Sequence, residues 1–174
     1  DWRARDCLRF TQAGDIIKAE IPHGRPSGIE GLVFNTRKPM FADWRVREAL
    51  ILAFNFEFIN QTLNGGLQPR IPSYFGNSFL GMDPGKPAEG RELELLQPFA
   101  AELPPGAIEG YALPVSDGDQ TNRKNIRAAA KLLEEAGWTV GDDGILKNGK
   151  GEPFAFEILL VTGQDEMASA AEVY

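Results

Sequence analysis

The sequence has very little cysteine and histidine. Its 174 residues include one cysteine, Cys7, and one histidine, His23. A single cysteine excludes an internal disulfide and a thiolate metal cluster. A single histidine excludes a His-rich zinc site and makes any Ser-His-Asp triad depend on His23. Stability must therefore come from a hydrophobic core, for which 174 residues with 43% hydrophobic side chains are sufficient.

Long apolar runs and an excess of positive charge are also missing. No stretch of about 18 consecutive apolar residues occurs, so the sequence predicts no membrane-spanning helix. Acidic residues number 25 and basic residues 18, which gives a formal net charge of −7. Binding to nucleic-acid phosphates needs a basic surface. We therefore expect no nucleic-acid partner.

Hydrophobic periodicity predicts helices along much of the chain. Asp43 can begin one of them, because its carboxylate accepts from free backbone amides in the first turn. Asn55 and Asn122 precede two further helical patterns and can cap them in the same way. Gly65 and Gly137 can end those two helices in the left-handed conformation. We expect helices at residues 1–10, 44–54, 56–63, 92–103 and 123–136, the last with Ile126, Ala129, Ala130, Leu133 and Ala136 on its buried face.

Shorter apolar runs between the helices predict strands. Residues 17–21 alternate between apolar and charged side chains, and 31–35 is a compact apolar run. Residues 145–146 and 154–161 flank an Asn148-Gly149 turn and are expected to form a hairpin. Strands interleaved with helices predict an α/β fold with a mixed sheet and flanking helices.

Residues 66–90 predict an irregular excursion, because Gly, Pro, Ser and Asn are frequent there. Residues of these types interrupt both helices and strands. Three aromatic residues lie within the excursion. We expect them to pin it to the body of the domain: Tyr74, Phe75 and Phe79.

No motif of a common enzyme class is present. The sequence contains no G-x-x-x-x-G-K-[ST], no G-x-G-x-x-G opening a helix and no G-x-S-x-G. Glu134 and Glu135 are adjacent on a helix and point in different directions, so they cannot converge on one substrate atom. His23 is interpreted as a structural or surface residue. We expect no catalytic residues, no metal site and no cofactor.

Three ordered stretches are similar to a known family. Residues 31–57 contain FNTRKPMFADWRVREAL and resemble the "FNT…PF.D.RVR.AL" signature of the extracytoplasmic solute-binding proteins of family 5, the oligopeptide and dipeptide group of ABC importers. Residues 125–138 resemble the family's "A..LL.EAGW" helix, and 143–160 its "DG.L…G.PF.FE.L" hairpin. Residues 21–28 and 55–57 lean toward the YejA-like branch, which takes oligopeptides and microcin C. At Asn55 many relatives carry Asp, a mild departure because both residues cap helices.

The resemblance implies a receptor that captures a peptide or peptide-like solute and delivers it to ABC permease subunits of the inner membrane. It places residues 1–174 within the C-terminal lobe of a type II periplasmic-binding-protein clamshell. The chain would then be a fragment of a larger two-lobed, periplasmic, monomeric protein without enzymatic activity. Asp1 at the start and an incomplete helix after Asp165 agree with this expectation.

The expected ligand-binding residues are Thr162, Gln164, Asp165 and Glu166, together with Asn35. The first four follow a strand and precede a helix, and α/β sheets bind ligands at the carboxyl ends of their strands. Thr162 and Gln164 can bond an extended peptide, and Asp165 or Glu166 can meet a cationic group. Asp165 can equally serve only to cap the helix. The short amide of Asn35 can bond the backbone or a neighbouring turn, so a scaffold role stays open for it.

Two other classes of function remain as alternatives. A hydrolase of peptides or glycans would need two carboxylates facing each other across a pocket, roughly 5–10 Å apart. A protein-interaction domain would show a large exposed apolar patch and no cleft.

Overall fold

The computed structural model describes residues 12, 14, 17, 19 and 21–174. The helix expected at 1–10 lies outside them. A strand was also expected at 17–21, but the described residues of this range are not in a strand, and Ile17 and Ile21 are 87% and 82% exposed. None of the helices in the described part of the chain is both long enough and apolar enough to cross a membrane.

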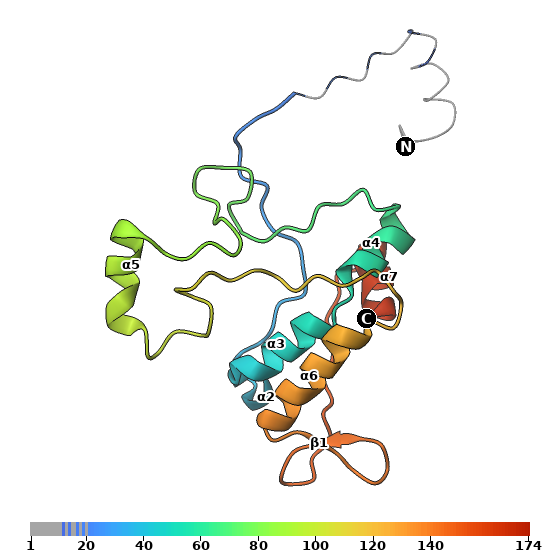
Figure 1. Ribbon diagram of the computed structural model, residues 1–174. Helices are drawn as coiled ribbons and strands as arrows, with labels where there is room; N and C mark the ends of the chain where they lie inside the picture. Colours follow the sequence, from blue (N-terminus) through green and yellow to red (C-terminus); the bar gives the residue numbers. More distant parts are fainter. Residues whose placement is uncertain (1–11, 13, 15–16, 18, 20) are drawn as a thin grey trace.

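The centre of the molecule is a pair of helices, α3 (Trp44–Ala53) and α6 (Arg123–Glu135), which lie side by side (Figure 1). α3 begins as predicted, because Asp43 Oδ1 accepts from Arg45 N at 2.9 Å. The Arg45 guanidinium binds the same carboxylate at 2.6 Å and donates to Glu135 O at 2.6 Å. Its hydrogen bond holds the pKa of Asp43 below the usual value. The cap of α3 therefore also orients the arginine that ties α3 to the end of α6.

The buried face of α6 overlaps the predicted one in part: Ala129 is buried, and Leu133 and Ala136 pack against the core. Asn125 and Ala129 are the buried residues of this helix, and Asn122 is buried directly before it. Asn122 does not cap α6 with its side chain; its Nδ2 donates instead to Leu52 O at 3.0 Å. The inward-facing stripe therefore includes amides, which a pattern of apolar residues cannot reveal. Two residues predicted to be inward are exposed: Ile126 and Ala130.

The remaining helices flank this pair. α2 (Pro39–Ala42) precedes α3, and α4 (Phe56–Asn64) ends as predicted at Gly65, whose φ is 59°. α7 (Asp165–Val173) packs against α4. After α7, Tyr174 Oη donates to Leu50 O at 2.9 Å, and burial raises the pKa of Tyr174 to about 12. The end of the described chain is thus fixed to α3.

β-structure in the described part of the chain is limited to one small ladder and one isolated bridge, between Lys147 and Pro153. β1 (Thr139–Val140) pairs antiparallel with β2 (Leu146–Lys147), with Val140 opposite Leu146. The hairpin predicted between 145–146 and 154–161 is present only at its start, where Phe154 N donates to Leu146 O at 2.8 Å. Residues 155–161 continue without strand pairing. The predicted mixed sheet with flanking helices is therefore represented by a two-stranded ladder beside the helices.

A row of aromatic rings forms the core under α2 and α3. Phe34 contacts Phe41 at a centroid distance of 5.5 Å, and Phe41 contacts Phe156 at 5.6 Å. Phe154 lies next to Phe156 and packs edge-on against Trp138 at 4.8 Å. Such edge-on pairs add about 0.5–1.5 kcal/mol each beyond the area they bury. The segments 31–35 and 154–161 are therefore held against α2 by their rings, although neither pairs as a strand.

α5 (Gly90–Leu96) is set apart from the other helices on a closed stem (Figure 1). It continues into a 3₁₀ turn, η1 (Gln97–Phe99), so it ends earlier than the predicted 103. In the stem, Gly85 N donates to Tyr111 O and Ala88 N to Ile108 O, both at 2.8 Å. Gly110 is required here: its φ is 99°, and an added Cβ would lie 2.7 Å from the Gly85 backbone.

Candidate functional site

The predicted ligand loop lies between the extended segment 154–161 and α7. Thr162, Gln164, Asp165 and Glu166 are all exposed. The residue at the N-cap position is Gln164, and its side chain makes no capping bond. Asp165 is the first helical residue, so it and Glu166 place negative charge in the first turn, where the helix dipole favours it. The carboxylates are accessible and are not consumed by capping.

Asn35 lies elsewhere, in the turn before α2. Its Oδ1 accepts from Arg37 N at 3.2 Å and its carbonyl from Lys38 N at 3.0 Å. The ring of Phe34, the residue before Asn35, packs against Phe41, and Phe41 in turn contacts Phe156. Thr162 follows Phe156 by six residues. No hydrogen bond among the described residues joins Asn35 to the four loop residues.

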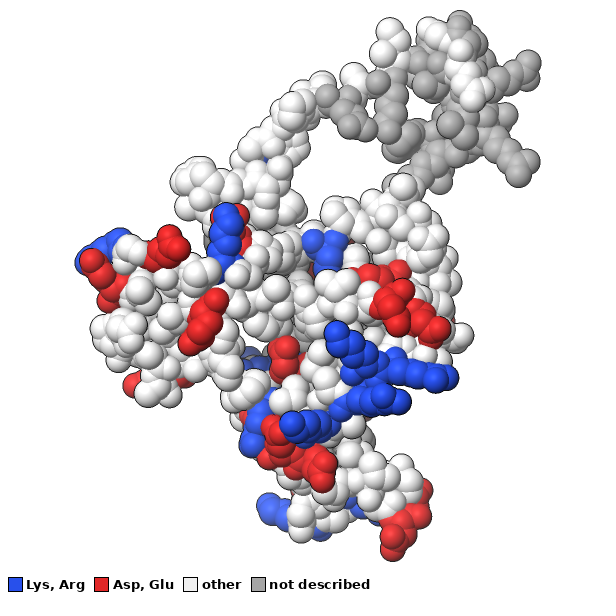
Figure 2. Space-filling view, viewed as in Figure 1, with Lys and Arg blue, Asp and Glu red and all other residues white. Residues whose placement is uncertain are grey.

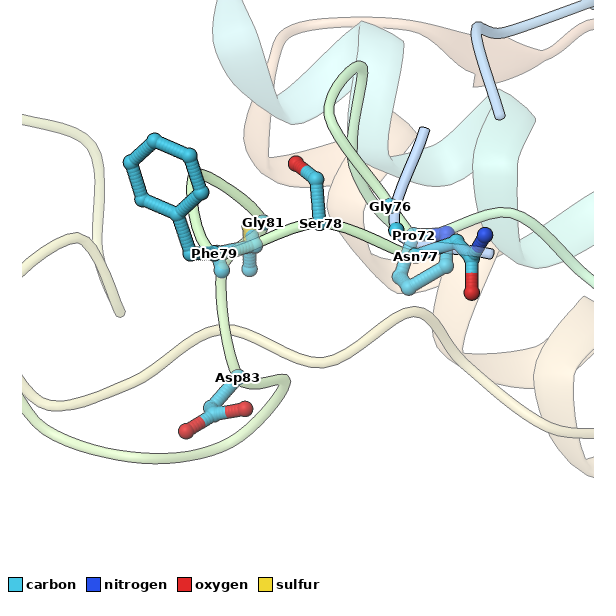
Figure 3. A pocket seen from close by; sticks show the side chains of 9 residues that line it. Pro72, Gly76, Asn77, Ser78, Phe79, Gly81 and Asp83 are labelled. Carbon is cyan, nitrogen blue, oxygen red and sulfur yellow. The ribbon is translucent and has the colours of Figure 1, made fainter. Parts of the chain in front are cut away.

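A hollow of about 440 Å³ opens in the excursion after α4 (Figure 3). Three glycines leave backbone accessible, and the ring of Phe79 projects from the loop with 95% of its surface exposed. Asp83 supplies a carboxylate, which pairs with Lys86 at 2.6 Å. Figure 3 shows the Phe79 ring and the Asp83 carboxylate pointing to opposite sides of the loop. The lining residues are Gly24, Pro72, Gly76, Asn77, Ser78, Phe79, Gly81, Met82 and Asp83.

Polar bonds, rather than aromatic packing, hold this hollow together. Asn77, in the left-handed conformation with φ 65°, donates from Nδ2 to His23 O at 2.8 Å and to Arg25 O at 3.1 Å. Ser27 N donates to Gly76 O at 2.8 Å. The prediction that the aromatic residues pin the excursion is wrong, because all three are at least half exposed: Tyr74 (65%), Phe75 (51%) and Phe79 (95%). His23 Nδ1 accepts from Arg25 N at 3.3 Å, which agrees with a structural or surface role.

A second polar group fixes the segment between the stem and α6. Asn55 Nδ2 donates to Asp119 O at 2.7 Å, and Asn55 Oδ1 accepts from Ser116 Oγ at 2.6 Å. Ser116 N donates to Glu57 Oε2 at 2.9 Å, and Arg70 lies 3.9 Å from Glu57. The prediction that the Asn55 side chain caps α4 is therefore wrong. Next to this group is a hollow of about 220 Å³, lined by Val115, Ser116, Asp117, Asn122, Lys124 and Asn125.

Burial sets the protonation of one further group in this region. Tyr111 Oη donates to Glu48 Oε2 at 3.0 Å. Burial, and then the Glu48 charge, raise the pKa of Tyr111 well above its usual value. Tyr111 therefore stays a neutral hydrogen-bond donor at neutral pH. Its hydrogen bond to Glu48 joins the stem to α3.

The carboxylates do not form a catalytic pair in either hollow. The larger one contains Asp83 and the smaller one Asp117 as its single acid. A glycosidase-type mechanism needs two carboxyl groups on opposite sides of the substrate. Within residues 21–174 and the four described residues before them, no three His, Cys, Asp or Glu side chains gather as a metal site would require. The geometry therefore gives no support to the hydrolase alternative.

Comparison with known proteins identifies similar chains. Residues 9–174 match the family described as bacterial extracellular solute-binding proteins, family 5 Middle. The chain is 40% identical over 159 residues to the peptidoglycan-binding protein YepA of Agrobacterium fabrum, covering 91% of this chain and 26% of that protein. It is 38% identical over 161 residues to the uncharacterized protein YejA of Escherichia coli, covering 92% and 26%.

A third relative has a name that refers to peptides. The probable peptide-binding protein YejA of Agrobacterium fabrum is 36% identical over 150 residues, which cover 84% of this chain and 24% of that protein. The chain thus spans about a quarter of the length of the curated relatives it matches.

Proposed function

The chain belongs to the bacterial extracellular solute-binding proteins of family 5, in their YejA-like branch, and from this we propose that it is part of the substrate-binding component of an ABC importer. The observation that carries the proposal is the match over residues 9–174, nearly the whole chain. We assign the chain to the C-terminal lobe of a type II clamshell in a longer, periplasmic, monomeric protein. Permease subunits of the inner membrane would be its partners.

The solute that we propose is a peptide or a peptide-like molecule. One relative is named for binding peptidoglycan and another for binding peptides. Peptidoglycan contains peptide chains, so the chemical feature that these ligands share is a peptide. An extended peptide is recognised by hydrogen bonds to its backbone and by charges that meet its ends.

We assign the contact with the solute to the loop residues 162–166. Thr162 and Gln164 offer side chains that donate and accept hydrogen bonds, and all are exposed. Asp165 and Glu166 are accessible carboxylates that could pair with a peptide ammonium group or a basic side chain. We also retain Asn35 as a contact. It lies in the turn before α2, so we expect only an extended solute of several residues to contact both Asn35 and the loop.

The test uses the whole protein that contains these 174 residues. Calorimetric titration with a cationic tripeptide should give saturable binding, and mass spectrometry should recover the peptide unchanged. The double substitution Asp165→Asn with Glu166→Gln should weaken binding roughly tenfold, as expected for a lost ion pair in a closed site.

The matched control replaces two carboxylates of α6 with amides. Glu134→Gln with Glu135→Gln changes the net charge equally on exposed helical residues far from the loop in sequence. Its affinity should equal that of the unsubstituted protein. If no peptide binds saturably, or if the peptide is cleaved, the proposed function is wrong. If both double variants bind equally, the function stands but the assignment to residues 165 and 166 is wrong.

A further inference from the structure

One face of α6 is basic although the chain as a whole is acidic. Arg123, Lys124, Arg127 and Lys131 are exposed on this helix. Successive residues of an α-helix are about 100° apart, so these four positions share an arc of about 100°. The buried residues Asn125 and Ala129 lie on the opposite side. Figure 2 shows these blue side chains gathered over α6, with red side chains at either end of the group. We call these four residues the basic face.

The charges at the two ends of α6 are the reverse of those that its helix dipole favours. The first turn of α6 contains Arg123 and Lys124 and no acidic residue, and the last turn contains Glu134 and Glu135 and no basic residue. The N-terminal end of a helix carries partial positive charge, which favours acidic side chains there and basic ones at the other end. Helix stability would therefore select the reverse arrangement.

Charge pairs within the helix do not explain the basic face either. Arg123, Arg127 and Lys131 follow at intervals of four residues, where like charges repel. Lys131 reaches Glu135 at 3.8 Å, in the less favourable order along the helix. For Arg123, Lys124 and Arg127, no carboxylate among the described residues forms an ion pair.

The fold holds α6 without the basic face. Arg45 of α3 binds Glu135 O, and Asn122 binds Leu52 O, so both ends of α6 are tied to α3 by other groups. The buried residues of α6 complete the packing. A set of charges that neither the helix nor the contacts within these 174 residues require, and that local rules disfavour, is expected where a function requires it.

The charge pattern favours a protein partner over a membrane. Asp117 and Asp119 precede the basic face, Glu134 and Glu135 follow it, and the net charge is −7. A uniformly anionic lipid surface would attract the four basic residues but repel these flanks and the rest of the chain. A protein surface with a central cluster of carboxylates can match both. We propose that the basic face docks onto such a cluster on the extracytoplasmic side of the permease, an assignment that rests on the proposed function.

The experiment compares two triple variants of the whole protein with equal change in charge. The first is Arg123→Glu, Lys124→Glu and Arg127→Glu. The control is Arg37→Glu, Arg91→Glu and Lys150→Glu, at exposed positions outside α6. Each is added to proteoliposomes that contain the cognate permease and ATPase subunits, and ATP hydrolysis is followed against its concentration.

The first variant should need roughly tenfold more protein for half-maximal stimulation, since charge complementarity mainly sets encounter rates. The control should behave as the unsubstituted protein. Both should keep the solute affinity and the midpoint of thermal unfolding. Raising NaCl from about 0.05 to about 0.3 M should weaken stimulation by the unsubstituted protein more than by the first variant.

Three results would overturn the proposal. Equal half-maximal concentrations for the two variants would show that the basic face does not dock on the permease. A lower unfolding midpoint or changed solute affinity in the first variant alone would show that the face serves the protein itself. Binding of the unsubstituted protein, but not the first variant, to phosphatidylglycerol vesicles would assign the face to lipid. If the unsubstituted protein neither binds solute nor stimulates ATP hydrolysis, the proposed function itself fails.

Discussion

At the scale of single residues, buried amides join parts of the chain that are far apart in sequence. Asn55, Asn122 and Asn125 are buried, and each donates from Nδ2 to a backbone carbonyl of another segment. A buried carbonyl without a partner is costly, and an amide group supplies a donor at a fixed distance. These three side chains therefore act as cross-links between α3, α4, α6 and the segment before α6.

Replacing Asn55 with Asp tests this role. The change removes the donor to Asp119 O, which lies 2.7 Å away, and puts a carboxylate oxygen opposite that carbonyl. We expect the free energy of unfolding to fall by about 1–3 kcal/mol, the usual cost of an unpaired buried polar group. Urea denaturation at neutral pH measures it.

Gln120→Glu is the matched control for that substitution. It makes the same amide-to-carboxylate change at an exposed residue in the same segment. Its stability should stay within about 0.5 kcal/mol of the unsubstituted chain. Equal, small effects for both substitutions would mean that stability does not depend on the amide donor of Asn55.

Whether the role of a side chain could be predicted depends on how far away in sequence its hydrogen-bond partner lies. The Asp43 cap was predictable because the carboxylate bonds an amide two residues away. The roles of Asn55 and Asn77 were not, because their partners are 64 and up to 54 residues away. The hollow that Asn77 closes could therefore be foreseen from sequence only as an irregular excursion.

At the scale of elements, helices were predictable and strands were not. α3, α4 and α7 begin at or next to the expected residues, because an α-helix satisfies its backbone bonds within a few residues. A strand is completed only by a neighbour, and 31–35 and 155–161 have apolar patterns but no paired neighbour in the described chain. The position of the proposed ligand loop was predictable because α7 begins at Asp165, whereas no local sequence pattern relates the loop to Asn35.

The stem below α5 offers a test at the same scale. Gly110→Ala would place a methyl group 2.7 Å from the Gly85 backbone, so the two sides of the stem must separate. We expect faster amide hydrogen exchange at Gly85 and Ala88 and at least roughly tenfold faster trypsin cleavage after Arg91, since local opening controls both.

Gly118→Ala is the control, because it changes a glycine with positive φ without creating a steric contact. Gly118 has a similarly positive φ of 78°, but an added Cβ would meet nothing within 4 Å. The substitution should lower the free energy of unfolding by about 1 kcal/mol through backbone strain, and it should leave amide hydrogen exchange at Gly85 and Ala88 unchanged. Equal effects of the two substitutions on the stem would contradict the close approach at Gly110.

At the scale of the whole molecule, apolar side chains remain uncovered along the segment 154–161. Leu159 is 97% and Val161 67% exposed, and the backbone beside them lacks strand partners. The chain matches only about a quarter of the length of these relatives. We infer that segments of a longer protein cover residues 154–161, and that the 174-residue chain alone associates through this unpaired apolar segment, as exposed strand edges do.

Leu159→Lys should reduce that association. In the 174-residue chain the substitution should change stability by less than about 0.5 kcal/mol, because the side chain is exposed. Sedimentation velocity should show fewer oligomers than for the unsubstituted chain. Gln120→Lys, at an exposed polar position, should leave the oligomers unchanged. Equal oligomer content in both variants would mean that association, if present, does not involve residues 154–161.

The closed stem under α5 has a consequence for how this chain tolerates change. Its two sides meet through the bonds from Gly85 and Ala88, so the backbone enters and leaves the intervening residues 89–107 at nearly the same place. Those residues include no buried side chain in α5 or η1. Residues 89–107 are thus a suitable insertion site: a tag, a fluorescent reporter or a loop of another length could replace them while the aromatic core stays intact.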